Sequence, residues 1–157
     1  MIKIISIGKI KEAYLKDAIL EYSKRISKYS KLELIELKDE IIPDNPSDAI
    51  INKIKDIEGN SILSKIKDDY VIALDLKGEM LDSVEFAKKI EGINTKGIST
   101  ITFVIGGSLG LSDNVLSRAN YKLSFSKLTF PHQLFRVILL EQIYRAYKIL
   151  NNEIYHK

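Results

Sequence analysis

The sequence predicts an α/β fold in which a mostly parallel sheet is covered by helices on both faces. Short runs rich in isoleucine, valine and aromatic residues alternate with segments whose apolar residues recur at helical spacing. Strands that alternate with helices favour parallel pairing, because each helix returns the chain to the same edge of the sheet. The chain has 157 residues and contains no Gly/Ser linker or internal repeat, so we expect a single domain over 1–157.

The first third of the chain holds two predicted strands with a helix between them. Residues 2–8 are mostly isoleucine and end at a glycine, which indicates a buried strand. Between Leu15 and Tyr29, apolar residues recur three and four positions apart, the pattern of an amphipathic helix. Residues 32–37 alternate apolar residues with glutamate, so we expect a strand with one solvated face.

A loop and a second helix follow. Residues 39–48 are acidic and contain two prolines, which predicts a loop. Ser47 is a candidate N-cap for a helix that runs to about Lys65. Gly59 should weaken or interrupt this helix, because glycine lowers helix stability.

The third strand and third helix lead into the centre of the chain. Residues 70–76 (YVIALDL) indicate a strand, and Lys77-Gly78 is its expected exit turn. Ser83 is the expected cap of a short helix through Ile90, and residues 92–97 form a loop between two glycines.

The remaining elements surround two loops. A β-branched strand at 101–105 is followed by a glycine loop at 106–110 and a helix that starts near Ser112. A further strand at 121–125 leads through a polar segment to a helix over 131–150. Apolar residues lie nearly all round this last helix, which therefore should be buried on both sides, most simply in a subunit interface.

The two strand-exit loops, ~20 residues apart, mark the predicted ligand site, because carboxyl-edge loops of parallel sheets are where ligands bind. A phosphate-binding loop would need a Gly-Lys-Ser/Thr ending, which is missing here. A dinucleotide fingerprint would need an earlier glycine motif and an acidic partner, so a nucleotide-dependent oxidoreductase is disfavoured. Taken alone, a glycine loop of this spacing is more often a tight structural turn, and it is the second loop beside it that favours a ligand site.

Charge is distributed unevenly along the chain. The net charge is +3, but Arg118 to Lys157 holds seven basic and two acidic residues, which gives +5 there and −2 elsewhere. This surplus suits either a solvated helix face or a footprint for a polyanion such as RNA. Because the chain has no cysteine, no long apolar run and no segment typical of a signal peptide, we expect a cytoplasmic protein without membrane spans.

Catalytic side chains of the familiar kinds are scarce. The histidines are His132 and His156, and no cluster has metal-ligand spacing, so we expect no metal. His132, in a first helical turn, can be a local hydrogen-bonding residue or a catalyst. The tail at 155–157 combines an aromatic ring, an imidazole and an ammonium, which suits a nucleotide. Methyl transfer from a sulfonium donor fits this small set of side chains, because the donor is already activated and the protein mainly has to position the two reactants.

Four segments together resemble one known family. These are VIGGS at 104–108, LSFSKLTFPH at 123–132, Arg136 and the terminal YHK at 155–157. They resemble the bacterial ribosomal large subunit pseudouridine methyltransferase H family of the SPOUT class, over essentially the whole chain. The resemblance implies a parallel α/β sheet with a deep C-terminal trefoil knot. One departure is Leu109, where many relatives carry a polar residue.

The resemblance also implies a ligand and a set of site residues. The methyl donor would be S-adenosylmethionine, held at three strand-exit loops. The implied donor-binding residues are Leu74, Gly106, Phe125, Ser126, Lys127, Leu128, Thr129 and Phe130. Glycine permits close backbone approach, and apolar side chains can flank the adenine.

The implied acceptor is N3 of a pseudouridine in 23S rRNA, presented on assembled ribosomes, and the implied assembly is a homodimer whose tail completes the site. We expect Arg136, with Lys157 as a second candidate, to stabilise the developing anion, and His132 or His156 to assist deprotonation of N3 or to orient the base. Tyr155, His156, Lys157 and Arg136 are the expected RNA contacts. The alternative function is a ribosome- or RNA-binding module of the same fold without activity.

Overall fold

All strands of the sheet run parallel, in the order β2-β1-β4-β3-β5, in a computed structural model that describes residues 1–156. The strands are β1 (Ile2–Ile7), β2 (Leu32–Leu37), β3 (Tyr70–Met80), β4 (Ile101–Ile105) and β5 (Tyr121–Ser124). The predicted parallel α/β sheet is confirmed. The trefoil knot that the resemblance implies stays a prediction.

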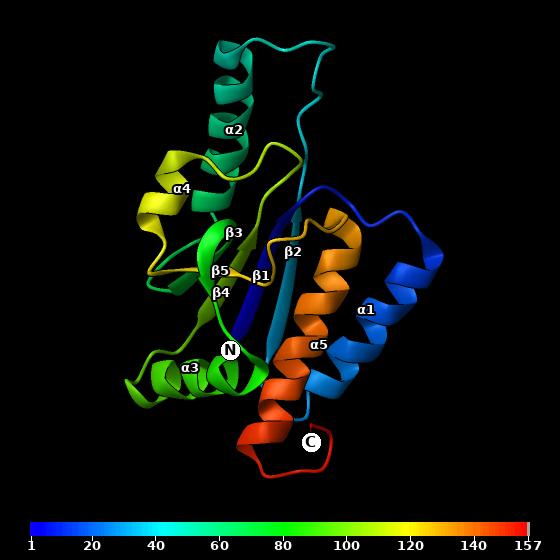
Figure 1. Ribbon diagram of the computed structural model, residues 1–157, viewed down its shortest axis with the longest axis vertical. Helices are drawn as coiled ribbons and strands as arrows, with labels where there is room; N and C mark the ends of the chain where they lie inside the picture. Colours follow the sequence, from blue (N-terminus) through cyan, green and yellow to red (C-terminus); the bar gives the residue numbers. More distant parts are fainter. Residues whose placement is uncertain (157) are drawn as a thin grey trace.

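Helices cover both faces of the sheet (Figure 1). One face carries α1 (Ala13–Ile26), α3 (Ser83–Thr95) and α5 (His132–Leu150), and the other carries α2 (Asp48–Leu63) and α4 (Asp113–Arg118). Side chains alternate across β1 accordingly, so that Ile4 belongs to the core under α3 and α5 and Ile5 to the core under α4. The sheet thus separates two hydrophobic cores.

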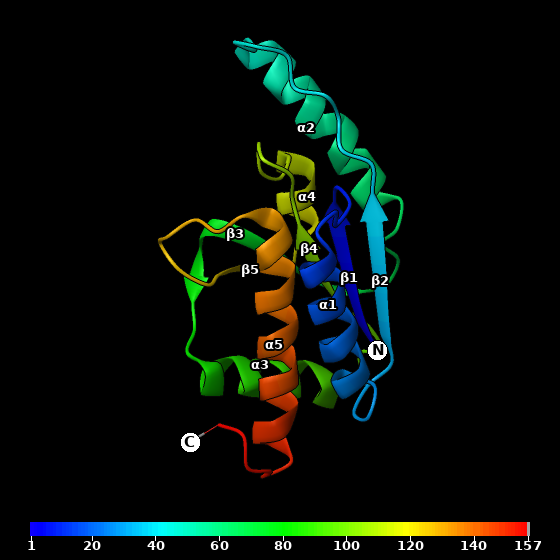
Figure 2. The ribbon, with the colours of Figure 1, turned by 90° about the vertical axis from the view of Figure 1, so that its right-hand side faces the viewer.

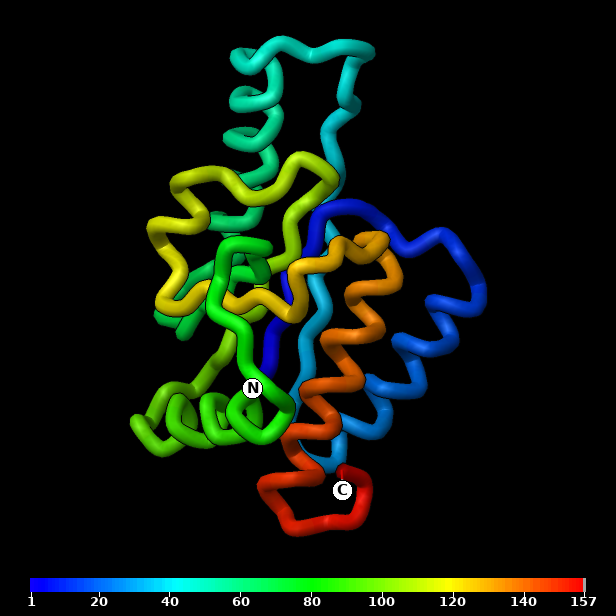
Figure 3. Tube along the Cα trace, in the orientation of Figure 1, coloured from blue at the N-terminus to red at the C-terminus, as the bar shows by residue number. Residues whose placement is uncertain are grey.

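The segment after β2 extends away from the sheet. Residues 38–47 connect β2 to the far end of α2, and α2 then returns to the body of the protein (Figures 2 and 3). Ser47 caps α2 as predicted, accepting a hydrogen bond from the backbone N–H of Ile50 at 3.3 Å. Gly59 does not interrupt the helix. It is buried where α2 meets α4, and a Cβ atom there would collide with Ser112.

The predicted exit turn at Lys77-Gly78 is wrong, because β3 continues to Met80. Leu123 of β5 pairs first with Leu74 and then with Glu79, so the intervening residues of β3 bulge out of register. Gly78 makes this possible: a Cβ atom there would lie 2.7 Å from the carbonyl carbon of Lys122.

Two expectations about α3 are also wrong. Its N-cap is Asp82 rather than Ser83, and Asp82 and Glu85 form a reciprocal capping box with hydrogen bonds of 2.8 Å. The helix runs past Ile90 to Thr95 and includes Gly92, because the buried Ile90 and Ile93 continue its apolar face. The packing of these two isoleucines outweighs the tendency of Gly92 to end the helix.

Helix α5 is packed on one side only within the chain. Leu139, Leu140 and Ile143 are fully buried against the sheet, α1 and α3. Leu134 keeps 39% of its surface exposed, and Val137 and Ile138 are half-buried. The expected burial on both sides is therefore not reached in a single chain.

Candidate functional site

A cavity of about 510 Å³ opens at the carboxyl edge of β3, β4 and β5. It lies where the two predicted strand-exit loops meet the end of β3, the position expected for a ligand in a parallel sheet. Its walls are the residues Leu74, Asp75, Leu76, Ile105, Gly106, Gly107, Ser108, Leu109, Gly110, Leu111, Leu123, Ser124, Phe125, Ser126, Leu128, Thr129, Phe130, His132 and Phe135. Apolar side chains and loop backbone dominate this surface.

The glycine loop forms one wall by folding tightly on itself. The N–H of Gly110 donates to the carbonyl of Gly107 at 3.0 Å, and Gly110 adopts a φ of 86°. A Cβ atom on Gly106 would lie 3.0 Å from the Gly110 carbonyl carbon. A side chain at Gly106 would therefore open the loop and fill the edge of the cavity.

The opposite wall is the loop 125–131, whose shape is fixed by short hydrogen bonds and aromatic packing. The Ser126 hydroxyl accepts from the N–H of Leu128 at 3.0 Å. Phe125 meets Phe135 of α5 edge-on at 5.1 Å between ring centroids, and Phe130 stacks on the same ring at 6.0 Å. Phe135 thus anchors both ends of the loop to α5.

Most of the expected donor-binding residues lie together in this cavity. Leu74, Gly106, Phe125, Ser126, Leu128, Thr129 and Phe130 all line it, whereas Lys127 is not among the lining residues and its side chain is exposed. His132 also lines it, at the first turn of α5. Burial, together with the charge of Arg136, lowers the pKa of His132 below its ordinary value, which favours a neutral imidazole.

Arg136 is placed elsewhere. Its guanidinium is 4% exposed, forms an ion pair with Glu36 and donates to the carbonyl oxygens of Ile7 and Gly8 at 2.8 and 2.7 Å. It lines a second cavity of about 390 Å³ between α1, β1, β2 and α5, and is not among the residues lining the first. In this conformation Arg136 ties α5 to the ends of β1 and β2.

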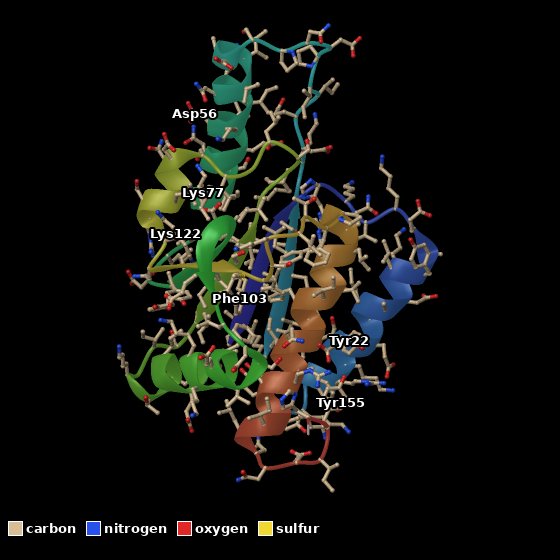
Figure 4. All side chains as sticks on the ribbon, viewed as in Figure 1. Tyr22, Asp56, Lys77, Phe103, Lys122 and Tyr155 are labelled. Atoms are coloured by element: carbon tan, nitrogen blue, oxygen red, sulfur yellow. The ribbon has the colours of Figure 1, made fainter. Side chains whose placement is uncertain are left out.

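The described part of the tail lies at the far end of α5. Eighteen helical steps separate His132 from Leu150, which is about 27 Å along the axis. After this end the chain turns back along the helix, and Tyr155 lies beside α5 (Figure 4). The Tyr155 hydroxyl donates to Glu141 at 3.0 Å, and the His156 ring contacts Arg145 at 3.1 Å. The chain thus does not bring Tyr155 or His156 to its own cavity, and Lys157 lies outside the described residues.

Sequence reasoning missed several residues of the cavity. Asp75 and Leu76 follow Leu74 at the end of β3, and Phe135 projects from α5 one turn after Pro131. Their position at strand and helix ends was the available signal, and only the fold shows that these ends converge. Asp75 adds a carboxylate to a cavity that otherwise consists of apolar side chains, backbone, hydroxyls and one histidine.

Within residues 1–156, no group of three or more His, Asp or Glu side chains could hold a metal ion. Over the same residues, no helix combines the length and the apolar character that crossing a membrane requires.

A parallel α/β sheet with a glycine-edged, largely apolar cavity at its carboxyl edge defines the class of small-ligand-binding α/β proteins. Comparison with known proteins narrows this class. The family described as "Predicted SPOUT methyltransferase" matches residues 1–156. Two relatives named ribosomal RNA large subunit methyltransferase H, from Clostridium botulinum strains Langeland and Okra, are 67% and 66% identical over 157 residues, covering 99% of each chain.

A Clostridium perfringens (strain SM101) relative, named ribosomal RNA large subunit methyltransferase H 1, is 63% identical over 99% of both chains. The chain therefore belongs to the SPOUT methyltransferase family and, within it, to the ribosomal RNA large subunit methyltransferase H family. It is an enzyme of the methyltransferase class. The structure of a probable methylase family protein from Haemophilus influenzae Rd KW20 has a similar fold, with a TM-score of 0.56 at 14% identity, over 99% of this chain and 70% of that one.

Proposed function

We propose that this enzyme transfers a methyl group from S-adenosylmethionine to N3 of a pseudouridine in large-subunit (23S) ribosomal RNA. Family membership supports methyl transfer, and the names of the relatives support ribosomal RNA as the acceptor. The observation that carries the assignment of the donor is the cavity itself. Seven of the eight residues that the family resemblance implies for the donor line one cavity, although they come from three separate loops.

The cavity fits an adenosine-containing ligand. Its volume, about 510 Å³, is within the usual range for small-molecule sites, ~300–1,000 Å³. Leu74, Leu128 and Phe130 can pack against the faces of a base, and the backbone of the loop 125–130 offers N–H and C=O groups for its edge. The absence of a Cβ atom at Gly106 lets Gly110 and Leu111 pack against it, which keeps the loop backbone tightly folded at the edge of the cavity. When bound, S-adenosylmethionine supplies a methyl group activated by a positively charged sulfur.

His132 is our candidate for handling the proton. Methylation of N3 requires loss of the N3–H proton, and a neutral imidazole at the edge of the cavity can accept it. His156 stays a second candidate, contributed by another protomer. For Arg136, whose guanidinium is already occupied by Glu36 and two carbonyl oxygens, we propose a positioning role instead of direct stabilisation of the anion or contact with RNA.

We further propose that the active form is a homodimer formed through α5. The half-exposed apolar residues of α5 and the exposed Tyr14 and Leu20 of α1 support this, because α1 and α5 pack side by side. A partner is also needed if Tyr155 and His156 are to reach a cavity, since in their own chain they contact Glu141 and Arg145 of α5, away from the cavity at the start of that helix. Such a site, surrounded by the basic C-terminal part of the chain, would act on the ribosome in the cytoplasm.

Methylation of ribosomes tests the proposal directly. Purified 70S ribosomes from a strain that lacks this modification should gain one methyl group per particle when incubated with enzyme and S-adenosylmethionine. Mass spectrometry of nuclease fragments should place the group on N3 of a pseudouridine. Methylation of another nucleotide would refute the acceptor assignment.

The alternative function, a binding module without activity, makes a different prediction in a binding experiment. Thermal unfolding is measured with S-adenosylmethionine, its demethylated product and NAD. We expect stabilisation by the two sulfur ligands, about 2.7 kcal/mol at 100 times the dissociation constant, and none by NAD. Binding to ribosomes without any response to the sulfur ligands would favour the binding module.

A further inference from the structure

The cavity at the carboxyl edge of β3, β4 and β5 is the proposed site of the methyl donor and is called the donor cavity below. Apart from His132, the ionisable side chains that the structure describes in its walls are acidic only. Among its lining residues within 1–156, Asp75 is the only aspartate or glutamate, and there is no lysine or arginine. Lys127, next to two lining residues, is itself not part of the wall, and Arg136 lines the other cavity. The side chains of the cavity therefore carry one formal negative charge when His132 is neutral.

The carboxylate of Asp75 is not neutralised by its neighbours. Asp75 is half-buried at the bulge of β3, and within residues 1–156 it forms no ion pair. Its one hydrogen bond within that range comes from the N–H of Lys77, at a long 3.4 Å. Most of its hydrogen-bonding capacity is thus available to a ligand, and the apolar walls around it strengthen its attraction for a cation.

The proposed methyl donor and its product differ in the charge on sulfur, which determines how strongly a carboxylate attracts them. S-adenosylmethionine has a positively charged sulfonium, whereas S-adenosylhomocysteine has a neutral thioether and is otherwise the same molecule without the methyl group. The methionine and adenosine parts cannot discriminate between the two. A negative charge in the cavity can do so, because it attracts the sulfonium and has no such interaction with the thioether.

We propose that Asp75 is a specificity-determining residue that makes the cavity prefer the cationic methyl donor over its neutral product. The inference rests on the proposed function. In the reaction the S–CH3 bond breaks and an N3–CH3 bond forms, while the N3 proton passes to the general base. Breaking the S–CH3 bond converts the sulfonium to a neutral thioether, which removes the attraction to Asp75. Asp75 thus favours loading of the donor and release of the product.

Calorimetric titration tests this with binding as the readout. Dissociation constants are measured for S-adenosylmethionine, S-adenosylhomocysteine and sinefungin, a donor analogue whose amine replaces the sulfonium and keeps the positive charge. For Asp75→Asn, we expect about tenfold weaker binding of the two cationic ligands and less than threefold change for the neutral product. Asp75→Glu, which keeps the charge, should largely retain the preference of the wild-type protein.

Asp68→Asn is the matched control. It removes the same charge from an exposed residue just before β3, at the opposite edge of the sheet, and should leave all three dissociation constants unchanged. Equal weakening of all three ligands by Asp75→Asn would overturn the proposal, because it would place Asp75 on a shared group such as the ribose hydroxyls. No change with any ligand would overturn it as well. Failure of the donor assignment is separately visible, since the wild-type protein itself would then bind none of the ligands.

Discussion

The guanidinium of Arg136 and the carboxylate of Glu36 form a 2.8 Å ion pair that joins α5 to β2 across 100 residues of sequence. The same guanidinium donates to the carbonyl oxygens of Ile7, the last residue of β1, and of Gly8, the residue after it. Arg136 therefore fixes the N-terminal end of α5 over the carboxyl edge of the sheet, where His132 and Phe135 line the donor cavity.

Replacement of Arg136 by alanine should lower the free energy of unfolding by about 3 kcal/mol, because it leaves buried carbonyl oxygens without donors. Urea denaturation measures this change. Arg25→Ala is the control: its ion pair with Glu21 is exposed and screened by solvent, so its loss should lower the free energy of unfolding much less. If the substitution abolished methylation but left the free energy of unfolding unchanged, Arg136 would instead act directly in the methyl-transfer reaction.

Gly78 does not line the donor cavity, but Gly78→Ala should still disrupt it by displacing β5. The added methyl group would lie 2.7–2.8 Å from the backbone of Lys122 and Leu123, which cannot move without shifting β5. We expect destabilisation of at least ~2 kcal/mol and more than tenfold weaker donor binding, measured by denaturation and calorimetry. Gly92→Ala, within α3 and free of contacts within 4 Å, should instead stabilise the protein by up to ~1 kcal/mol. Similar effects of both substitutions would contradict the assigned role of Gly78.

The sequence was sufficient to predict the strands and the place of the cavity, because both depend on local signals. Apolar β-branched runs mark β1 and β4, and the glycines at 106, 107 and 110 mark the loop that follows β4. In a parallel sheet these loops meet at one edge whatever the order of the strands. The family resemblance then supplied the ligand that we propose for this cavity, S-adenosylmethionine.

The features that were missed depend on partners distant in sequence. The bulge of β3 exists because residues near Gly78 rejoin β5 about 45 residues later, and no local pattern reports such pairing. Arg136 lies in a basic segment that suggested an anionic ligand, but its partner is Glu36 of β2, 100 residues earlier in the sequence. Asp75 is the one acidic residue in the predicted apolar strand at 70–76, and only the fold shows that it lines the cavity.

The rate of methylation should depend on pH through His132. Partial desolvation and the charge of Arg136 lower the pKa of this imidazole below its ordinary 6.5, so it stays neutral to a lower pH than a fully solvated histidine. If His132 accepts the N3 proton, the single-turnover rate should fall only below pH 6.5, as the imidazole becomes protonated. His132→Ala should lower the rate at least tenfold and abolish this acidic limb. A wild-type limb that survives the substitution would exclude His132 as the acceptor.

The free energy of unfolding, like the rate, should decrease at acidic pH because of His132. The unfolded chain protonates His132 near pH 6.5 and the folded chain only at lower pH, so stability decreases as the pH falls below 6.5. His132→Ala should therefore lose less stability than the wild-type protein between pH 7 and pH 5. Urea denaturation at several pH values, with equal slopes for both proteins, measures the difference.

Asp69 should control stability at acidic pH from the edge of the sheet remote from the cavity. Its carboxylate accepts from Lys3 at 2.9 Å and from Thr102 at 2.7 Å, which joins β1 and β4 to the residue before β3. Burial acts to raise the pKa of Asp69, but the hydrogen bonds from Thr102 and Lys3 and the charge of Lys3 outweigh it, so the pKa lies below its ordinary 3.8. The unfolded chain thus binds this proton first, and stability is lost as the pH falls below about 3.8.

Asp69→Asn should reduce the free energy of unfolding at pH 7 by about 3 kcal/mol, because it leaves the ammonium of Lys3 buried without a countercharge. It should also flatten the decline of stability below pH 4, since the titrating group is gone. Asp68→Asn changes an exposed neighbour and should do neither. Donor affinity at pH 7 should stay within threefold of wild type in both variants, because Asp69 acts on the amino edge of the sheet and the cavity lies at the carboxyl edge. A variant that kept its stability but lost its donor affinity would show that the two edges are coupled more tightly than these contacts imply.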